Sequence, residues 1–125
     1  MLPARLVEEV KRLLDEGWAV DLIESEGMAC IVFHGFVVPH GYSKAVTDLL
    51  LMLPLSYPNG KPDMFWVDVD LHLANGSVPR SADVVQTHLD RQWRRFSWHV
   101  TMWNPATDDL RTYLEFVNSR LTKGV

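Results

Sequence analysis

The sequence predicts an α+β domain in which an N-terminal helix, a four-stranded antiparallel meander, a long flap and a C-terminal helix follow one another. Three observations predict this class. Apolar residues recur at helical spacing near both ends of the chain, and short apolar runs separated by turn residues lie between these two segments. One stretch before the last helix shows neither helical nor strand periodicity. Helices that flank a run of strands are typical of domains in which helices cover an antiparallel sheet. The 125 residues suffice for one hydrophobic core, so we expect a single domain over residues 1–125.

The first element is predicted to be a helix that begins near Pro3 and ends at Gly17. Proline is favoured in the first helical turn, and glycine just beyond the last one. The charged face of this helix is expected to meet solvent. Five apolar residues recur at helical spacing and are expected to pack on the sheet: Leu2, Leu6, Val10, Leu13 and Leu14.

Four strands are expected between this helix and the flap. Each combines apolar residues with flanking turn residues, and the first two are expected to form a hairpin. The link between the third and fourth strands holds three prolines in nine residues, which excludes a helix or a central strand there. The predicted strands cover residues 18–22, 28–33, 47–53 and 64–69.

The apolar residues of 70–88 recur at neither helical nor strand spacing, so this segment is predicted to form the flap. Loops of this length in compact domains are often functional. Asn104 and Pro105 are expected to open the last helix, with Asp108 and Asp109 in its first turn. The predicted buried stripe of this helix consists of Leu110, Tyr113, Leu114, Val117 and Leu121.

Composition excludes several classes of protein. The chain has 12 Lys and Arg against 16 Asp and Glu, a net charge of −4, so we expect no nucleic-acid partner. The first residues lack a signal-peptide pattern, and the longest apolar run, residues 49–55, is too short to cross a bilayer, so no membrane partner is expected. A single cysteine excludes an intrachain disulfide and fits a reducing, cytoplasmic location.

No cofactor is expected from the sequence. Five histidines raise the question of a zinc site, but they show none of the spacings that are typical of metal ligands. These histidines are His34, His40, His72, His88 and His99.

Two motifs carry a resemblance to a known superfamily. The segment LMLPLSYPNGKPDMFWVD looks like a strand, a Tyr-Pro-x-x-x-Pro loop (Tyr57, Pro58, Pro62) and a further strand of the ubiquitin-conjugating enzymes. The segment WNPATDDLRTYLEFVNSRL is similar to the Trp-x-Pro motif, here Trp103 and Pro105, that precedes a helix in the same enzymes. The resemblance covers roughly residues 3–122 and implies a ubiquitin-conjugating-like fold.

Within this superfamily the chain resembles the prokaryotic conjugating-enzyme-like family E, through the runs PDMFWVDVDLHLANGSVP and QWRRFSWHVTMW. The resemblance implies a bacterial transferase that carries or transfers a ubiquitin-like modifier by acyl transfer, with a place in phage defence. It implies two partners, a ubiquitin-like protein and a ubiquitin-activating-like enzyme. It also implies that the activating enzyme docks on the exposed face of the first helix, at Arg5, Glu9, Arg12 and Glu16.

The chain departs from the superfamily at the acceptor cysteine. The usual cysteine lies shortly before Trp103, where this chain has the residues Arg94 to Ser97, and the usual His-Pro-Asn is reduced to the segment His72 to Asn75. Cys30 falls in an apolar strand, where the residue type is most often a small buried hydrophobe.

Without that cysteine, acyl transfer needs a hydroxyl nucleophile and a base. Ser97, His99 and Thr101 are two residues apart, so in an extended segment they share one face. Trp98, Val100 and Met102 would then point to the other face. We therefore take Ser97 as the candidate acceptor and His99 as the candidate base, which predicts an oxyester in place of a thioester.

Other interpretations stay open. His99 can equally orient its loop through a backbone hydrogen bond, and Ser77 and Ser81 are further hydroxyl candidates. The loss of the cysteine also fits a catalytically inactive binding module that holds a ubiquitin-like protein or its activating enzyme.

Three further groups could support a site. Asp68 and Asp70 could orient a histidine, although alternating Asp is typical of the wet face of a strand, and Asn75 could donate to an oxyanion or simply form a turn. A basic and aromatic patch could hold a modifier tail or an acidic partner. Its members are Arg91, Arg94, Arg95, Trp93 and Trp98.

Overall fold

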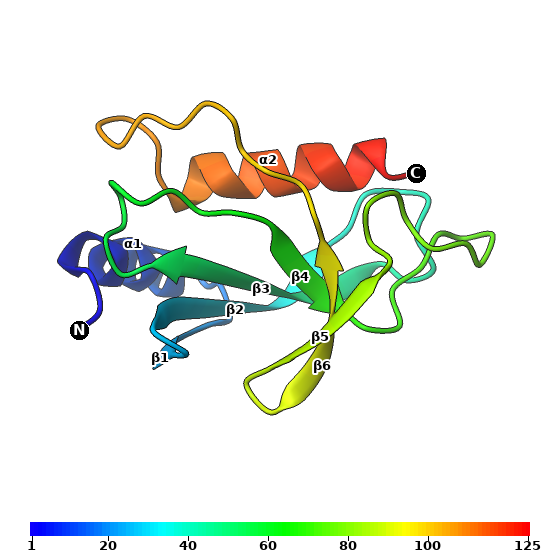
Figure 1. The fold of residues 1–125 in the computed structure, drawn as a ribbon, viewed down its shortest axis with the longest axis horizontal. Coiled ribbons are helices and arrows are strands. Elements are labelled where there is room, and N and C mark those ends of the chain that lie inside the picture. The colour runs from blue at the N-terminus through cyan, green and yellow to red at the C-terminus, as the bar shows by residue number, and fades with distance from the viewer.

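A computed structural model describes residues 1–125 as two helices and a six-stranded sheet. All neighbouring strands are antiparallel, in the order β1-β2-β3-β4-β6-β5 (Figure 1). The predicted α+β class is confirmed, with the helices at the two ends of the chain. The elements are α1 (Ala4–Asp15), β1 (Val20–Ser25), β2 (Met28–Val37), β3 (Val46–Pro54), β4 (Phe65–Asp68), β5 (Val84–His88), β6 (Arg91–Phe96) and α2 (Leu110–Lys123).

The predicted four-stranded meander is confirmed as β1 to β4, and a hairpin that was not predicted, β5–β6, extends the sheet to six strands through pairing of β6 with β4. The predicted flap over 70–88 ends in β5, and the run rich in aromatic residues and arginine contains β6. The turn between these two strands is formed by Leu89 (φ 53°) and Asp90 (φ 61°), which take the left-handed conformation that a two-residue hairpin requires. Because neither residue is Gly or Asn, the usual hairpin signature is missing from the sequence.

Both helices pack against the same face of the sheet (Figure 1). Leu6, Val10 and Leu13 of α1 are buried there as predicted, whereas Leu14 is 50% exposed. The predicted stripe of α2 is buried in full. The inner strands contribute residues that include Ile31, Phe33, Leu49, Leu51, Leu53, Phe65, Val67 and Phe96.

The last helix begins at Leu110, later than the predicted opening at Asn104 and Pro105. Asp109 is its N-cap: the carboxylate accepts the backbone N–H of Thr112 (3.0 Å), and the Thr112 hydroxyl accepts the backbone N–H of Asp109 (2.8 Å). This reciprocal capping fixes the start of the helix and leaves residues 97–109 as a long connection.

A second, smaller core covers the outer face of the sheet. Leu50 and Met52 alternate with inward-facing residues of β3, which explains why this strand is apolar throughout. Cys30 and Val32 of β2, Trp66 of β4 and Trp93 of β6 complete the cluster. The Trp66 indole N–H donates to Gln86 Oε1 (2.9 Å), and the Trp93 indole N–H donates to the carbonyl oxygen of His88 (3.0 Å). Neither helix has the length and apolar character that a membrane span requires.

Candidate functional site

The proline-rich loop, α1 and the start of α2 meet at the carboxylate of Glu9, whose side chain is only 11% exposed. Glu9 Oε1 accepts hydrogen bonds from the Tyr57 hydroxyl (2.9 Å) and from the backbone N–H of Leu110 (2.8 Å). Glu9 Oε2 accepts from Arg5 Nε (3.1 Å). Burial, together with the Glu9 charge, raises the pKa of Tyr57, so its hydroxyl stays protonated and donates.

Four of the five predicted motif residues come together around this carboxylate. The Trp103 indole N–H donates to the carbonyl oxygen of Pro58 (2.8 Å), and its ring packs against Tyr57 with centroids 6.1 Å apart. Arg5 donates to the carbonyl oxygens of Pro105 and Asp108. Pro62 is buried farther along the same loop. These contacts tie the second half of the connection between β6 and α2 to the proline-rich loop and to α1.

Ser97 lies immediately after β6, beside the flap. Its backbone N–H donates to the carbonyl oxygen of Ser81 (2.9 Å), and its Oγ accepts a hydrogen bond from Arg95 Nε (3.0 Å). Arg95 makes no ion pair with a carboxylate. A guanidinium beside a hydroxyl oxygen stabilises negative charge that develops there.

His99 lies two residues farther on, with its side chain 60% exposed. Its Nδ1 is 2.5 Å from Asp63 Oδ1, and no hydrogen bond joins His99 to Ser97. Asp63 was not among the candidates from the sequence. It precedes β4 and is 36 positions from His99, so no spacing rule relates the two residues.

The segment that carries both candidates is only partly as predicted. Trp98 packs on the inner core and Val100 is buried, while His99 and Thr101 are exposed, as an extended segment requires. The alternation fails at Met102, which is 87% exposed instead of pointing inward. A groove of about 200 Å³ follows in the same segment, and its apolar lining consists of Val100, Met102, Trp103, Tyr113 and Phe116.

The predicted basic and aromatic patch does not form one surface. Arg91 lies over the Trp93 ring on the outer face of the sheet (3.9 Å from guanidinium carbon to ring centroid). Arg94 instead donates to the carbonyl oxygens of Val69 and Ala82, on the other face. Arg95 and Trp98 remain near Ser97, and Arg120 of α2 stacks on Trp98 (4.9 Å).

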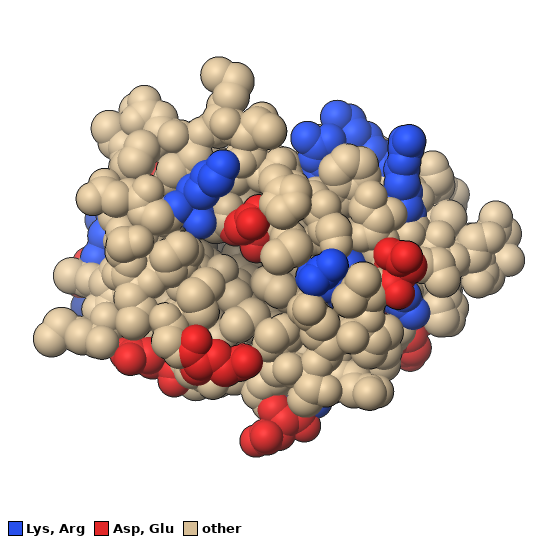
Figure 2. Space-filling model, viewed as in Figure 1, with Lys and Arg blue, Asp and Glu red and all other residues tan.

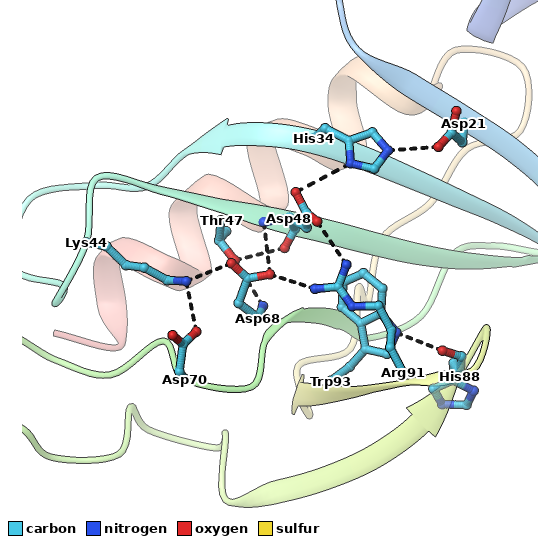
Figure 3. A network of polar contacts seen from close by, with 10 residues as sticks. All are labelled: Asp21, His34, Lys44, Thr47, Asp48, Asp68, Asp70, His88, Arg91 and Trp93. Atoms are coloured by element: carbon cyan, nitrogen blue, oxygen red, sulfur yellow. Dashed lines mark hydrogen bonds and ion pairs between the residues drawn. The ribbon is translucent and has the colours of Figure 1, made fainter.

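A network of ion pairs crosses the outer face of the sheet (Figure 3). Arg91 bridges Asp48 and Asp68 (2.9 Å each), and Lys44 bridges Asp68 and Asp70 (2.8 Å each). The hydrogen bond from Lys44 lowers the pKa of Asp70. Asp68 therefore links β4 to β6 through Arg91, Asp70 pairs with Lys44 beside the sheet, and neither carboxylate bonds to the imidazole of the candidate base.

The remaining candidates have local partners. Cys30 is fully buried, its thiol lies 3.8 Å from the carbonyl oxygen of Ser25, and burial, with the charge of Glu26, raises the pKa of the thiol. The side-chain oxygen of Asn75 accepts the backbone N–H of Ser77 (2.9 Å) in a turn. No three His, Cys, Asp or Glu side chains gather in a way that could hold a metal ion.

The predicted docking face of α1 needs correction. Arg5 and Glu9 bind inward, to the loops described above, and Glu16 forms an ion pair with Arg111 of α2. Of the four predicted residues, Arg12 alone is exposed without an ion-pair partner. The charge pattern of a helix could not reveal these tertiary contacts.

Comparisons with known proteins agree with this fold. The model of a family described as "Prokaryotic E2 family E" matches residues 6–124. Neither a search of curated proteins nor a search of solved structures finds a match.

Proposed function

The chain belongs to the prokaryotic E2 family E, which gives it a ubiquitin-conjugating-like role in general, and from this premise we propose that it carries its modifier as an oxyester on Ser97. The proposal rests on the polar groups that lie near the Ser97 hydroxyl. Its Oγ accepts from Arg95 Nε (3.0 Å), and the exposed imidazole of His99, paired with Asp63, lies two residues away. A hydroxyl, a cation and a base are the groups that acyl transfer to oxygen needs.

The proposed step starts from the modifier's C-terminal carbonyl group, activated as a thioester on its activating enzyme. The Ser97 Oγ attacks this carbon while its proton passes to Nε2 of His99. The carbon–sulfur bond breaks, and the leaving sulfur takes the proton from the imidazole. The new carbon–oxygen bond leaves the modifier attached to Ser97 as an ester, with Arg95 beside the oxygen that loses its proton.

The proposed partners are a ubiquitin-like protein and its activating enzyme, and the charge around Ser97 favours an acidic partner surface. Arg95 donates to Ser97 Oγ, Arg120 stacks on the adjacent Trp98, and neither guanidinium makes an ion pair within the chain, although the net charge is −4. Figure 2 shows basic side chains gathered over the C-terminal end of α2. For the activating enzyme we propose the exposed part of α1 around Lys11 and Arg12.

A catalytically inactive binding module is the second candidate function. The observation that favours it is that Ser97 and His99 have separate partners, Arg95 and Asp63, and share no hydrogen bond. In this alternative the same surface holds the modifier or the activating enzyme without forming a covalent bond.

The test is an adduct assay with ATP, a ubiquitin-like modifier and its activating enzyme. We expect an adduct that survives thiol reductant and is cleaved by hydroxylamine, because an oxyester lacks a thiol leaving group. Ser97→Ala should abolish it, and His99→Ala should slow its formation by about 10²–10⁴-fold. The exposed Ser81→Ala and the buried Cys30→Ala are the matched controls and should leave the adduct intact.

Three results of this assay would contradict the proposal that the modifier is carried as an oxyester on Ser97. If Ser97→Ala forms the adduct at the normal rate, the acceptor is another group. If His99→Ala alone abolishes it, the imidazole itself becomes the first candidate acceptor. If no adduct forms while the modifier still binds, the binding-module alternative is correct.

A further inference from the structure

We propose that Asp63 is a positioning residue, which holds the His99 imidazole in the tautomer that can accept a proton at Nε2. This inference rests on the proposed function, because the role of His99 as a base belongs to that function. It begins from the distance of 2.5 Å between His99 Nδ1 and Asp63 Oδ1.

The chemistry of this contact selects one tautomer. An ionised carboxylate only accepts hydrogen bonds, so the proton of a neutral imidazole must lie on Nδ1. Nε2 then carries the lone pair that a general base uses. Nε2 takes part in no hydrogen bond or ion pair within the protein, and the His99 side chain is 60% exposed, which leaves this nitrogen free to bind a reacting hydroxyl.

The pair is held by the backbone on both sides, unlike an ordinary surface ion pair. The residue after Asp63, Met64, donates its backbone N–H to the carbonyl oxygen of Trp98, the residue before His99 (3.1 Å). The carbonyl oxygen of Met64 accepts the hydroxyl of the buried Tyr113 (2.5 Å). Isolated surface pairs lose much of their strength to side-chain entropy. Here a backbone hydrogen bond already joins the segments that carry Asp63 and His99, so less conformational entropy is lost when the two side chains pair.

The next contact along the chain fixes the far side of the same segment. Lys61 Nζ donates to the carbonyl oxygen of Val100 (2.8 Å), and Pro62 between Lys61 and Asp63 is buried. Residues 61–64 therefore run beside residues 98–100, with Asp63 opposite His99. The other carboxylates considered for this role, Asp68 and Asp70, are bound to Lys44 and Arg91 on the outer face.

The first test uses the protein alone and reads the tautomer of His99 from its side-chain nitrogen shifts by NMR, at a pH where the imidazole is neutral. We expect the Nδ1–H form in the wild type. In Asp63→Asn the new amide N–H can donate to Nδ1, which should move His99 to the Nε2–H form, as replacing a carboxylate by an amide does in a catalytic triad. Asp70→Asn is the matched control and should leave His99 unchanged.

The second test is the rate of adduct formation in a double-mutant cycle. Asp63→Asn should slow the reaction by about 10²–10⁴-fold in the wild-type background. In the His99→Ala background it should have no further effect, because a positioning residue acts only through its partner. Circular dichroism and the urea midpoint identify any loss of folding, which would slow both backgrounds alike.

The outcomes separate the two proposals. A wild-type Nε2–H tautomer, or a tautomer that Asp63→Asn leaves unchanged, overturns the role of Asp63 even if the adduct forms on Ser97. An additive cycle also overturns it. An adduct that does not depend on Ser97 overturns the proposed function, whatever the tautomer of His99.

Discussion

His34 lies between two carboxylates on the outer face of the sheet (Figure 3). Its Nε2 is 2.8 Å from Asp21, and its Nδ1 is 3.5 Å from Asp48. The hydrogen bond to Asp21, together with the Asp48 charge, outweighs partial burial and raises the pKa of His34. A protonated His34 thus links the edge strand β1 to β2 and β3.

The raised pKa of His34 predicts a pH-dependent stability. Its stabilising contribution is complete below the unfolded-state value of about 6.5 and is lost as the pH rises through the higher folded-state pKa. We expect the free energy of unfolding of the wild type, relative to His34→Gln, to fall from pH 6 upward in urea titrations. His40→Gln, at a histidine without a carboxylate partner, should show no such difference. If the difference in the free energy of unfolding between the wild type and His34→Gln grows as the pH rises, the predicted direction is wrong.

At the residue scale, part of the candidate site could be predicted from the sequence. Ser97 and His99 stand out because a hydroxyl and an imidazole two residues apart can share a face of an extended segment. Asp63 could not be found, since its contact with His99 depends on how two distant segments run beside each other. The same limit applies to Glu9, which looks like a solvent-exposed residue of an amphipathic helix but is nearly buried.

At the scale of elements, Glu9 joins three segments: α1, the proline-rich loop and the first residue of α2. Replacing it with Ala leaves the Tyr57 hydroxyl and the Leu110 N–H without an acceptor and Arg5 without its carboxylate. We expect Glu9→Ala to lower the free energy of unfolding by about 3–5 kcal/mol. Urea denaturation measures the change.

The neighbouring Glu8 provides the control for this prediction. It is exposed and forms no ion pair, so Glu8→Ala should change the free energy of unfolding by no more than about 0.5 kcal/mol. Equal urea midpoints for the two variants would show that the Glu9 contacts contribute little. The motif residues Tyr57 and Trp103 could be recognised from the sequence, yet the carboxylate between them could not.

Element boundaries were predictable where local signals are strong. Helical spacing located α1 and the buried stripe of α2, and the proline-rich loop was located by composition. The hairpin β5–β6 was missed because Leu89 and Asp90 form its turn in place of the usual Asn and Gly. The start of α2 was placed too early because Asn104 also resembles an N-cap, whereas the capping box is built by Asp109 and Thr112.

At the scale of the whole molecule, the sheet is shared by two cores. Both helices cover one face (Figure 1). The hairpin β5–β6 contributes Trp93 to a smaller cluster on the other face. Because successive residues of β3 belong to opposite cores, we expect that loss of packing in one core also destabilises the strand that the other core needs. The candidate site depends on this arrangement, since Ser97 directly follows β6 and its connection ends at α2.

This arrangement predicts that the chain unfolds as one cooperative domain. Leu50 is fully buried in the outer cluster, so Leu50→Ala should lower the free energy of unfolding by about 2–5 kcal/mol. Circular dichroism, which follows the helices on the inner face, and tryptophan fluorescence should shift to the same lower urea midpoint. Val85→Ala on β5, at a side chain 43% exposed, should leave both midpoints within about 0.5 kcal/mol of the wild type. Trp66 and Trp93 report on the outer cluster, while Trp98 and Trp103 pack on the inner core. A separate fluorescence component that unfolds at lower urea than the circular dichroism transition would therefore mean that the outer cluster and its hairpin unfold independently of the helices.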